Sequence, residues 1–214
     1  MTKQPTQSGR QARGSLVVVS APSGSGKTTL IKRLLAAVPA LQFSVSYTTR
    51  RPRHGEKDGR DYFFVTRKKF EAMARAGEFV EWAEVVGHLY GTAQKQLREA
   101  EAAGQDILLD IDVHGHRQVR EKLPEAVSVF ILPPSFQELE KRLRRRRSDA
   151  PDVIEKRLRN ARREIGHWKE YDFIVVNDKL RSATKSLRCI VEAVKVRASV
   201  QADRIAEITE SFGG

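Results

Sequence analysis

The sequence is poor in cysteine, in aromatic residues and in long apolar runs. One cysteine, Cys189, stands among 214 residues, so no disulfide can form within the chain, which fits a reducing compartment such as the cytoplasm. Cys189 lies in an apolar helical pattern, which predicts a buried, inert thiol. No apolar run approaches the roughly 20 residues that a membrane-spanning helix needs.

The first 14 residues contain no acidic residue and no apolar core. A secretory signal is therefore excluded, and we expect residues 1–14 to form a flexible basic tail, with an organelle-targeting segment as the alternative. The formal net charge of the whole chain is +12, which points to anionic partners such as nucleotides, nucleic acid or an acidic surface. A chain of 214 residues favours one domain with an inserted flap or lid over two independent domains.

The strongest local signal is a glycine-bearing loop between an apolar strand, 16–20, and a helical pattern that begins at residue 29. In that setting, backbone N–H groups and the helix N-terminus form a cradle for phosphate. Lys27 can reach the terminal phosphates of a nucleotide, and the Thr28 hydroxyl can bind Mg²⁺. The residues expected at the donor nucleotide are Ala21, Pro22, Ser23, Gly24, Ser25, Gly26, Lys27, Thr28 and Thr29.

Apolar strands at 16–20, 107–112, 127–132 and 171–176 alternate with helical patterns, which is typical of a parallel sheet covered by helices. Alternation predicts a further strand over 43–48. Asp110 and Asp112 end the strand at 107–112, where open α/β sheets bind ligands, so Asp110 is placed to hold the Mg²⁺ shell.

Two further segments carry chemistry suited to a second nucleotide. Residues 49–64 gather several arginines and Tyr62 in one loop, which suits bidentate capture of a phosphate; the alternative is a solvated basic loop. Alternation over 78–92 predicts a hairpin that places Glu81 and Trp82 on different faces. A carboxylate on the ligand side can accept two N–H bonds from guanine, whereas one on the other side is a solvent-facing charge.

Two arginine-bearing helices follow, one capped by Ser135 and one carrying Ile154, Leu158 and Ala161 at helical spacing. Closing such a lid brings Arg142, Arg146 and Arg157 over a transferring phosphoryl group; the alternative is a nucleic-acid-binding or targeting run at 144–147. Asn177 and Asp178 end the last strand, where they either contact an adenine ring or turn the chain. The apolar face of the final helix predicts packing across the sheet, and Ile205 and Ile208 indicate more helix beyond it.

Taken together, residues 15 to about 198 resemble a guanylate kinase. The matching segments are 20–28, 44–53, 59–64, 78–83, 90–92, 107–112 and 176–178. The resemblance implies an α/β, P-loop three-layer fold with a central parallel sheet, an inserted nucleoside-monophosphate-binding region and a helical lid. It implies one domain over 15–214, with its core at about 15–43, 104–133 and 168–200, the GMP-binding region at about 44–95 and the lid at about 135–165.

The implied activity is ATP-dependent phosphorylation of GMP, and of dGMP, with Mg²⁺ in purine nucleotide metabolism. By position, Arg50, Arg53, Tyr62 and Tyr90 match ligands of the GMP phosphate, and Ser46, Glu81, Thr92 and Asp112 match groups around the guanine. Lys27 and Thr28 match the ATP-phosphate and Mg²⁺ site, with Asp110 as the second metal residue; Arg142, Arg146 and Arg157 match lid arginines, and Asn177 matches a residue near the adenine.

Two departures from the family pattern stand in this sequence. Arg147 replaces a lid glycine, and Ala21 replaces the first glycine of the phosphate-binding loop. Three other functions stay open: a kinase for another nucleoside monophosphate, a non-catalytic protein-binding module and a nucleic-acid binder. The kept Lys27 and Thr28 argue against the binding module, and the lack of an interleaved aromatic surface argues against nucleic acid. No membrane partner is expected, and the oligomeric state is open.

Overall fold

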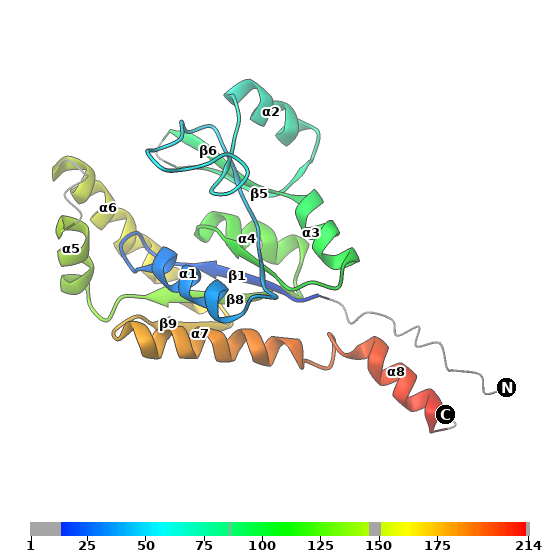
Figure 1. Cartoon of the computed structure of the whole chain (residues 1–214). Helices are drawn as coiled ribbons and strands as arrows, with labels where there is room; N and C mark the ends of the chain where they lie inside the picture. The colour runs from blue at the N-terminus through cyan, green and yellow to red at the C-terminus, as the bar shows by residue number, and fades with distance from the viewer. Residues whose placement is uncertain (1–13, 86, 146–150, 213–214) are drawn as a thin grey trace.

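The computed structural model describes residues 14–85, 87–145 and 151–212 (Figure 1). Its centre is a five-stranded sheet in the order β2-β7-β1-β8-β9, in which every neighbouring pair runs parallel. The strands are Gln42–Phe43 (β2), Ile107–Asp110 (β7), Leu16–Ser20 (β1), Val127–Leu132 (β8) and Phe173–Val176 (β9).

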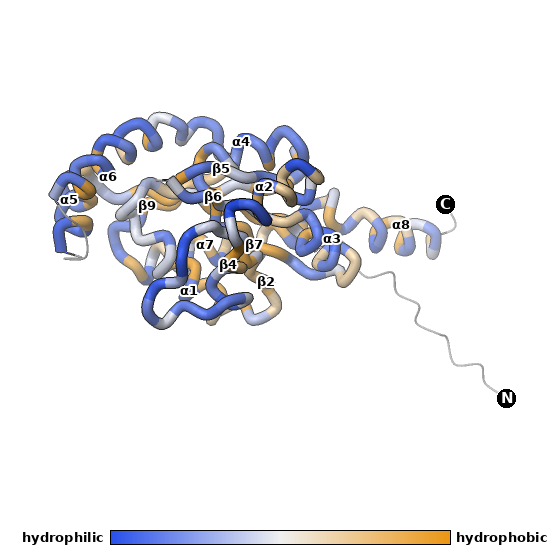
Figure 2. The backbone as a smooth tube through the Cα atoms, turned by 90° about the horizontal axis from the view of Figure 1, so that it is seen from above, coloured by the Kyte–Doolittle hydropathy of each residue, from blue (hydrophilic) through white to orange (hydrophobic). Residues whose placement is uncertain are grey.

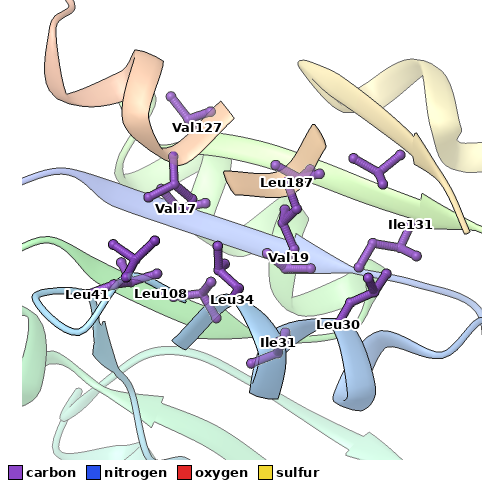
Figure 3. Close-up of a cluster of buried hydrophobic side chains, with 14 of the residues drawn as sticks. Val17, Val19, Leu30, Ile31, Leu34, Leu41, Leu108, Val127, Ile131 and Leu187 are labelled. Atoms are coloured by element: carbon purple, nitrogen blue, oxygen red, sulfur yellow. The ribbon is translucent and has the colours of Figure 1, made fainter. Parts of the chain in front are cut away.

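Helices cover both faces of this sheet because β1 is apolar on both sides. Val17 and Val19 point to one face, where they pack with Leu30 and Leu34 of α1 (Lys27–Ala37) and with residues of α7 (Leu180–Lys195) (Figure 3). Val18 points to the other face, where it packs with Val119 of α4 (Val113–Lys122). Successive strand residues face opposite sides, so this three-layer arrangement follows from the run of valines. The predicted α/β fold with a central parallel sheet is confirmed.

A second, four-stranded sheet in the order β4-β3-β6-β5 stands apart from the main sheet, at the top of Figure 1. Its strands are Phe63–Phe64 (β4), Tyr47–Thr48 (β3), His88–Ala93 (β6) and Phe79–Val85 (β5). The flanking helices are α2 (Arg67–Arg75) and α3 (Gln94–Ala102). The sheet has its own small core, in which Phe70 and Phe79 stack with ring centroids 4.5 Å apart. This unit corresponds to the inserted region expected from the sequence.

The segment predicted as a lid contains α5 (Phe136–Arg145) and α6 (Pro151–Glu164), followed by a 3₁₀ helix, η1 (Ile165–Glu170). The two helices share a separate core of Leu139, Leu143, Ile154, Leu158 and Ala161. Figure 2 shows these helices at one end of the molecule, largely hydrophilic along their length. The Ser135 hydroxyl accepts a hydrogen bond from the Glu138 N–H at 3.1 Å, which confirms the predicted cap.

Two expectations from the sequence are wrong. The segment 43–48 is not one strand: β2 ends at Phe43 in the main sheet, and β3 begins at Tyr47 in the second sheet. Cys189 is exposed on α7, whereas Leu187, Val191 and Val194 are buried. A residue two positions after Leu187 lies about 200° around the helix, on the side away from the sheet.

The chain ends in α8 (Ala202–Ser211), as Ile205 and Ile208 predicted, and both side chains are exposed. The tail at 1–13 lies outside the described residues. Among the residues that the structure describes, no helix is long and apolar enough to cross a membrane.

Candidate functional site

The phosphate-binding loop, residues 21–28, connects the carboxyl end of β1 to α1. Gly24 and Gly26 have φ of 93° and 87°, a left-handed conformation that favours glycine. A turn closes inside the loop, because the Ser25 N–H donates to the Pro22 carbonyl at 3.1 Å. The loop therefore leads directly into the N-terminus of α1, where the helix dipole and free N–H groups favour an anion.

Asn177 supports this loop from the end of β9. Its Nδ2 donates to the Ser25 carbonyl at 2.8 Å, and a Cβ added to Gly26 would lie 2.5 Å from the same nitrogen. The Arg142 guanidinium donates in turn to the Asn177 carbonyl at 3.1 Å and to the Glu138 carboxylate at 2.9 Å. Asn177 thus contacts the phosphate-binding loop directly, and Arg142 contacts Asn177. The predicted contact of Asn177 with adenine stays a prediction.

Lys27 and Asp110 meet at the carboxyl end of the main sheet. The Lys27 ammonium donates to the Ile111 carbonyl at 3.2 Å and forms an ion pair with Asp110. Thr28 follows Lys27 in the first turn of α1, and this residue is exposed. A threonine hydroxyl and a carboxylate are oxygen ligands of the kind that Mg²⁺ takes, usually with substrate phosphates and waters completing its shell. The described residues contain no cluster of three or more His, Cys, Asp or Glu side chains suited to a metal.

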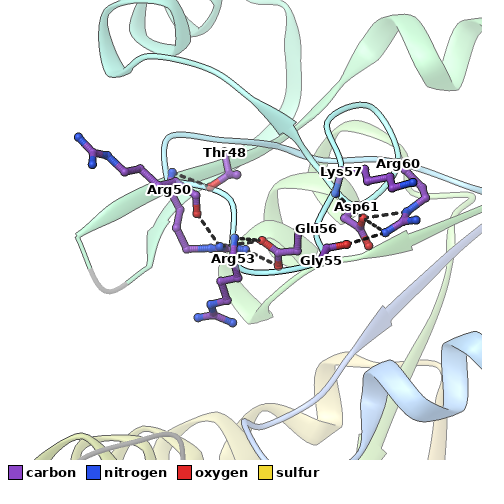
Figure 4. A network of polar contacts seen from close by, with 9 residues as sticks. Thr48, Arg50, Arg53, Gly55, Glu56, Lys57, Arg60 and Asp61 are labelled. Atoms are coloured by element: carbon purple, nitrogen blue, oxygen red, sulfur yellow. Dashed lines mark hydrogen bonds and ion pairs between the residues drawn. The ribbon is translucent and has the colours of Figure 1, made fainter.

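In the arginine-rich loop, Arg50 and Arg53 are organised around Glu56, a residue that sequence reasoning missed. Both oxygens of Glu56 accept from Arg50, at 2.9 and 3.0 Å, and one also accepts from the Arg53 N–H at 2.7 Å (Figure 4). The bond to Glu56 raises the pKa of Arg50 further, and Arg50 lowers the pKa of Glu56. The signal available in the sequence was a carboxylate three residues after Arg53, the first acidic residue of the loop at 49–64.

Tyr62 and Tyr90 stand beside Arg50, as expected. The Arg50 guanidinium carbon lies 5.3 Å from the centre of the Tyr62 ring, and the two tyrosine rings are 5.9 Å apart. Burial raises the pKa of Tyr62, and the negative charge of Asp110 raises it further. The carboxylate that acts on Tyr62 is therefore the one that pairs with Lys27.

Glu81, Thr92 and Asp112 gather next to that pocket. The Thr92 hydroxyl donates to Glu81 Oε1 at 2.6 Å, across the pair that joins β5 and β6. Glu81 is 4% exposed and Trp82 is 43% exposed, so the predicted difference of faces is confirmed. Asp112 caps α4 by accepting from the Gly115 N–H at 2.8 Å. A cavity of about 140 Å³ opens here, lined by Glu81, Ala83, Val85, Tyr90, Ile111 and Asp112.

The environment of Glu81 raises the pKa of its carboxyl group. Burial, and then the negative charge of Asp112, raises the pKa of Glu81 to about 7, although the Thr92 hydroxyl and the Lys122 ammonium oppose the shift. Sequence reasoning also missed Glu164, the last residue of α6. Burial, and then the charge of Asp112, raises the pKa of Glu164, whereas the charge of Lys27 lowers it.

The remaining predicted site residues are placed less closely. Ser46 lies between β2 and β3, half-buried, and its carbonyl accepts from the Phe63 N–H at 2.9 Å. In Figure 4 the Arg53 side chain extends away from Glu56. Arg157 lies on α6, half-buried. Arg146 and Arg147 lie outside the described residues.

A larger cavity, of about 650 Å³, lies at the amino ends of the central strands, where Leu16 and Ile107 begin β1 and β7. None of the predicted site residues lines it. Ligands of open parallel sheets bind outside the carboxyl ends of the strands, so the smaller cavity beside Glu81 is the better candidate for the active site.

Comparisons with known proteins agree with this geometry. The family model described as guanylate kinase matches residues 13–194. A guanylate kinase of Koribacter versatilis is 55% identical over 189 residues, which cover 87% of this chain and 81% of the relative. One of Dechloromonas aromatica is 48% identical over 197 residues, covering 92% and 98%.

Among solved structures, the crystal structure of guanylate kinase from Anaplasma phagocytophilum superposes with a TM-score of 0.71 at 34% identity. The match covers 87% of this chain and 89% of that one. A family model that spans most of the chain and relatives near half identity lead to one conclusion: the chain belongs to the guanylate kinase family.

Proposed function

We propose that the residues gathered at the carboxyl ends of β1 and β7 carry the family reaction, the ATP-dependent phosphorylation of GMP to GDP. The observation that supports this most is the closeness of the two anion sites. Tyr90, whose ring centre lies 5.9 Å from that of Tyr62, lines the same cavity as Ile111, and the Ile111 carbonyl accepts a hydrogen bond from Lys27. A phosphoryl group passing between two nucleotides needs such an arrangement, because its transfer depends on positioning and charge stabilisation.

In this proposal the donor and acceptor sites divide the substrates between them. Residues 21–29 hold the ATP phosphates, with Lys27 at the terminal phosphates and Asn177 near the adenine. Arg50, Arg53, Tyr62 and Tyr90 hold the GMP phosphate in line with the ATP γ-phosphate. Arg142, Arg146 and Arg157 are the lid arginines that offset charge on the equatorial oxygens of the transferring group.

The guanine is read at the bottom of the acceptor site. Ionised Glu81 accepts N–H bonds from the base, and Ser46, Thr92 and Asp112 complete its surroundings. The Thr92 hydroxyl fixes one carboxylate oxygen of Glu81, so the carboxylate is already oriented before the base arrives. The pocket surrounds a purine base, which supports dGMP as a second acceptor, because none of the four residues is proposed to contact the ribose.

Mg²⁺ is the proposed cofactor, held by Thr28 and Asp110, largely through water. When bound, it neutralises phosphate charge and orients the transferring group. The single exposed thiol and the lack of a disulfide support a cytoplasmic location. We further propose one guanylate-kinase domain over 15–214, with the small sheet as its GMP-binding region and α5 and α6 as its lid.

Replacement of Lys27 tests the donor site. Lys27→Ala removes the ammonium that reaches the terminal phosphates, so we expect kcat to fall by a factor of about 10² or more with the fold intact. The measurement is a coupled assay of ADP formation, with thermal unfolding as the check of folding. Activity at the original level in a folded variant would contradict the proposed role.

Replacement of Glu81 tests the acceptor site. Glu81→Ala is expected to raise the KM for GMP by about 10²-fold and to leave the KM for ATP within about threefold, since a site that pairs N–H groups loses most when one partner is removed. Assays with GMP, dGMP, AMP and UMP as acceptors measure the change. Equal losses for GMP and ATP would rule out Glu81 as the residue that reads the base.

A further inference from the structure

Two glutamine side chains form hydrogen bonds with the backbone next to residues of the proposed guanine site. Gln118 of α4 accepts from the Trp82 N–H at 3.2 Å and donates to the Trp82 carbonyl at 2.8 Å. Gln96 of α3 accepts from the Val45 N–H at 2.9 Å and donates to the Val45 carbonyl at 2.7 Å. Each carboxamide therefore binds both polar backbone groups of one residue.

The two residues bound in this way are chain neighbours of two residues proposed to surround the base. Trp82 follows Glu81, and Val45 precedes Ser46. β5 is the edge strand of the second sheet, and Val45 lies where the chain passes from the main sheet to that second sheet. A carboxamide carries the same donor and acceptor as a peptide group, so each glutamine takes the place of a neighbouring strand.

α4 fixes Glu81 at two further points. The pairing of β5 with β6 shifts between Phe79 and Glu81, so Val80 is the extra residue of a β-bulge. The Lys122 ammonium donates to the Val80 carbonyl at 2.6 Å. A Cβ added to Gly115 would lie 2.5 Å from Glu81 Oε2, so this helix position touches the carboxylate itself. Gly115, Gln118 and Lys122 are three and four residues apart, hence on one face of α4.

A bulge changes the direction of the side chain next to it, and a bulge at a strand edge needs partners to keep one geometry. The bonds from Gln118 and Lys122 lie on both sides of Glu81 and supply those partners. The carboxylate direction thus depends on α4 as much as on β5.

We propose that Gln96 and Gln118 are positioning residues for base selectivity: they hold the backbone at Val45 and Trp82 so that Ser46 and Glu81 meet the guanine edge. The proposal rests on the proposed role of Glu81 in reading guanine. Guanine offers Glu81 two N–H donors, whereas the hypoxanthine base of IMP lacks the exocyclic amino group and offers one. A misaligned carboxylate therefore loses more with GMP than with IMP.

The test uses Gln96→Met and Gln118→Met, which keep side-chain length and helix propensity and remove the hydrogen bonds. With ATP saturating, we expect the KM for GMP to rise about tenfold in each variant, the KM for IMP to rise less than about threefold, and kcat to change less than about threefold. The matched control is Gln94→Met on the same helix, whose carboxamide donates to the carbonyls of Gly77 at 2.9 Å and Phe79 at 3.5 Å and bonds neither Val45 nor Trp82. In this control, the ratio of kcat/KM for GMP to kcat/KM for IMP should stay at the original value.

Equal losses for GMP and IMP would mean a general structural role and would overturn the proposal, as would unchanged kinetics. Glu81→Gln, assayed beside them, separates this proposal from the one beneath it. If Glu81→Gln lowers the ratio of kcat/KM for GMP to kcat/KM for IMP and the Met variants do not, only the proposed role of Gln96 and Gln118 is wrong. If Glu81→Gln leaves this kcat/KM ratio unchanged, Glu81 does not recognise guanine. The proposed role of the two glutamines in base selectivity then fails with it.

Amide hydrogen exchange gives a second measurement, in the original protein, that does not depend on a variant folding. The Val45 and Trp82 amides should exchange slowly, and each should exchange faster in the corresponding Met variant while the Gln94→Met control leaves both unchanged. Exchange of either amide at the rate of an unstructured peptide in the original protein would overturn the proposal for that glutamine.

Discussion

Among single residues, Glu56 sets the geometry of Arg50 and Arg53, the residues proposed to hold the acceptor phosphate. It holds the Arg50 guanidinium through two bonds and accepts a third from the Arg53 N–H. Arginine has five N–H donors, so this grip leaves donors for a phosphate while it restricts the rotamers of a long side chain. Glu56→Gln weakens the grip, and we expect the KM for GMP to rise about tenfold with the KM for ATP unchanged.

The matched control for Glu56 is Asp61→Asn in the same loop. Asp61 pairs with Arg60 and accepts from the Lys57 N–H at 2.8 Å (Figure 4). It organises the loop without touching Arg50, so its replacement should change the KM for GMP less than about threefold. A lower KM for GMP in Glu56→Gln would mean that Glu56 competes with the phosphate for Arg50 and would contradict the prediction.

The protonation of Glu81 predicts a pH dependence of GMP binding. Burial and the charge of Asp112 raise its pKa to about 7 from 4.5, and only the ionised carboxylate accepts two N–H bonds. The ionised fraction grows as pH rises, so the KM for GMP should fall between about pH 6 and about pH 8 and level off above. The KM for ATP, measured over the same range, should stay flat. A flat profile for GMP would contradict the assignment of this pKa to the base-reading group.

The same shift has a consequence for stability with the opposite direction in pH. Because the pKa of Glu81 is raised on folding, the folded state binds the proton more tightly than the unfolded state. Its contribution to the free energy of unfolding is present below about pH 4.5 and is lost as pH rises through about 7, by at most about 3 kcal/mol. Urea unfolding of the original protein and of Glu81→Gln across this range measures it, since the variant should lack this slope. Parallel slopes would contradict the prediction.

Residues could be predicted from the sequence where the determining pattern is local. The donor loop is contiguous, and the facing of Glu81 follows from alternation within one strand. The partners of Gln96 and Gln118 could not be predicted in the same way, because 51 and 36 residues separate them from Val45 and Trp82. Nothing in a helical pattern distinguishes a glutamine that binds a remote backbone from one that faces water.

At the scale of elements, the lid is stabilised by a core of its own. Leu158 of α6 packs with Leu139 and Leu143 of α5 in a cluster separate from the one beneath the main sheet. Deleting a buried leucine side chain costs about 2–5 kcal/mol. In Leu158→Ala we expect that loss to fall on the packing of α5 against α6, so kcat should drop about tenfold, whereas the main thermal transition shifts little.

Leu187→Ala provides the contrasting variant for the lid. Leu187 is fully buried between α7 and the main sheet, so its loss should lower the Tm by several degrees and leave kcat of the folded enzyme near its original value. A fall of Tm in Leu158→Ala as large as that in Leu187→Ala would mean that the lid and the main sheet unfold as one unit.

Elements with a long, uniform pattern were predicted well, and those that change partner midway were not. The apolar runs of β1 and β8 and the capped helix α5 follow from local sequence. Residues 43–48 alternate throughout, yet the chain leaves one sheet at Phe43 and enters another at Tyr47. Strands of both sheets alternate with a period of two, so the alternation over 43–48 does not show where the chain passes from one sheet to the other.

For the molecule as a whole, local patterns gave the parallel sheet but not the way in which its parts face each other. Tyr90 of β6 lines one cavity with Ile111, which follows β7 and accepts a hydrogen bond from Lys27. This arrangement depends on the second sheet lying above the main sheet, as Figure 1 shows. The resemblance to a family supplied that arrangement, since no periodicity encodes a contact between two sheets.

The charge of the whole molecule predicts how nucleotide binding responds to salt. The chain carries a formal net charge of +12, and the proposed substrates are both anions, so their approach is favoured by long-range attraction. The Debye length shortens from about 10 Å at 0.1 M to about 3 Å at 1 M, and this attraction is then largely screened. We expect kcat/KM for GMP and for ATP to fall several-fold between these salt concentrations.

The reacting groups themselves lie in partly buried pairs such as Lys27–Asp110, which salt screens less. For that reason kcat should change less than about twofold while KM rises for both nucleotides. Sodium chloride and potassium acetate at equal ionic strength should act alike, which separates screening from binding of a particular anion in the arginine pocket. A fall in kcat with constant KM would instead place the effect of salt on the transfer step, and the charge of the molecule would then have no part in capturing its substrates.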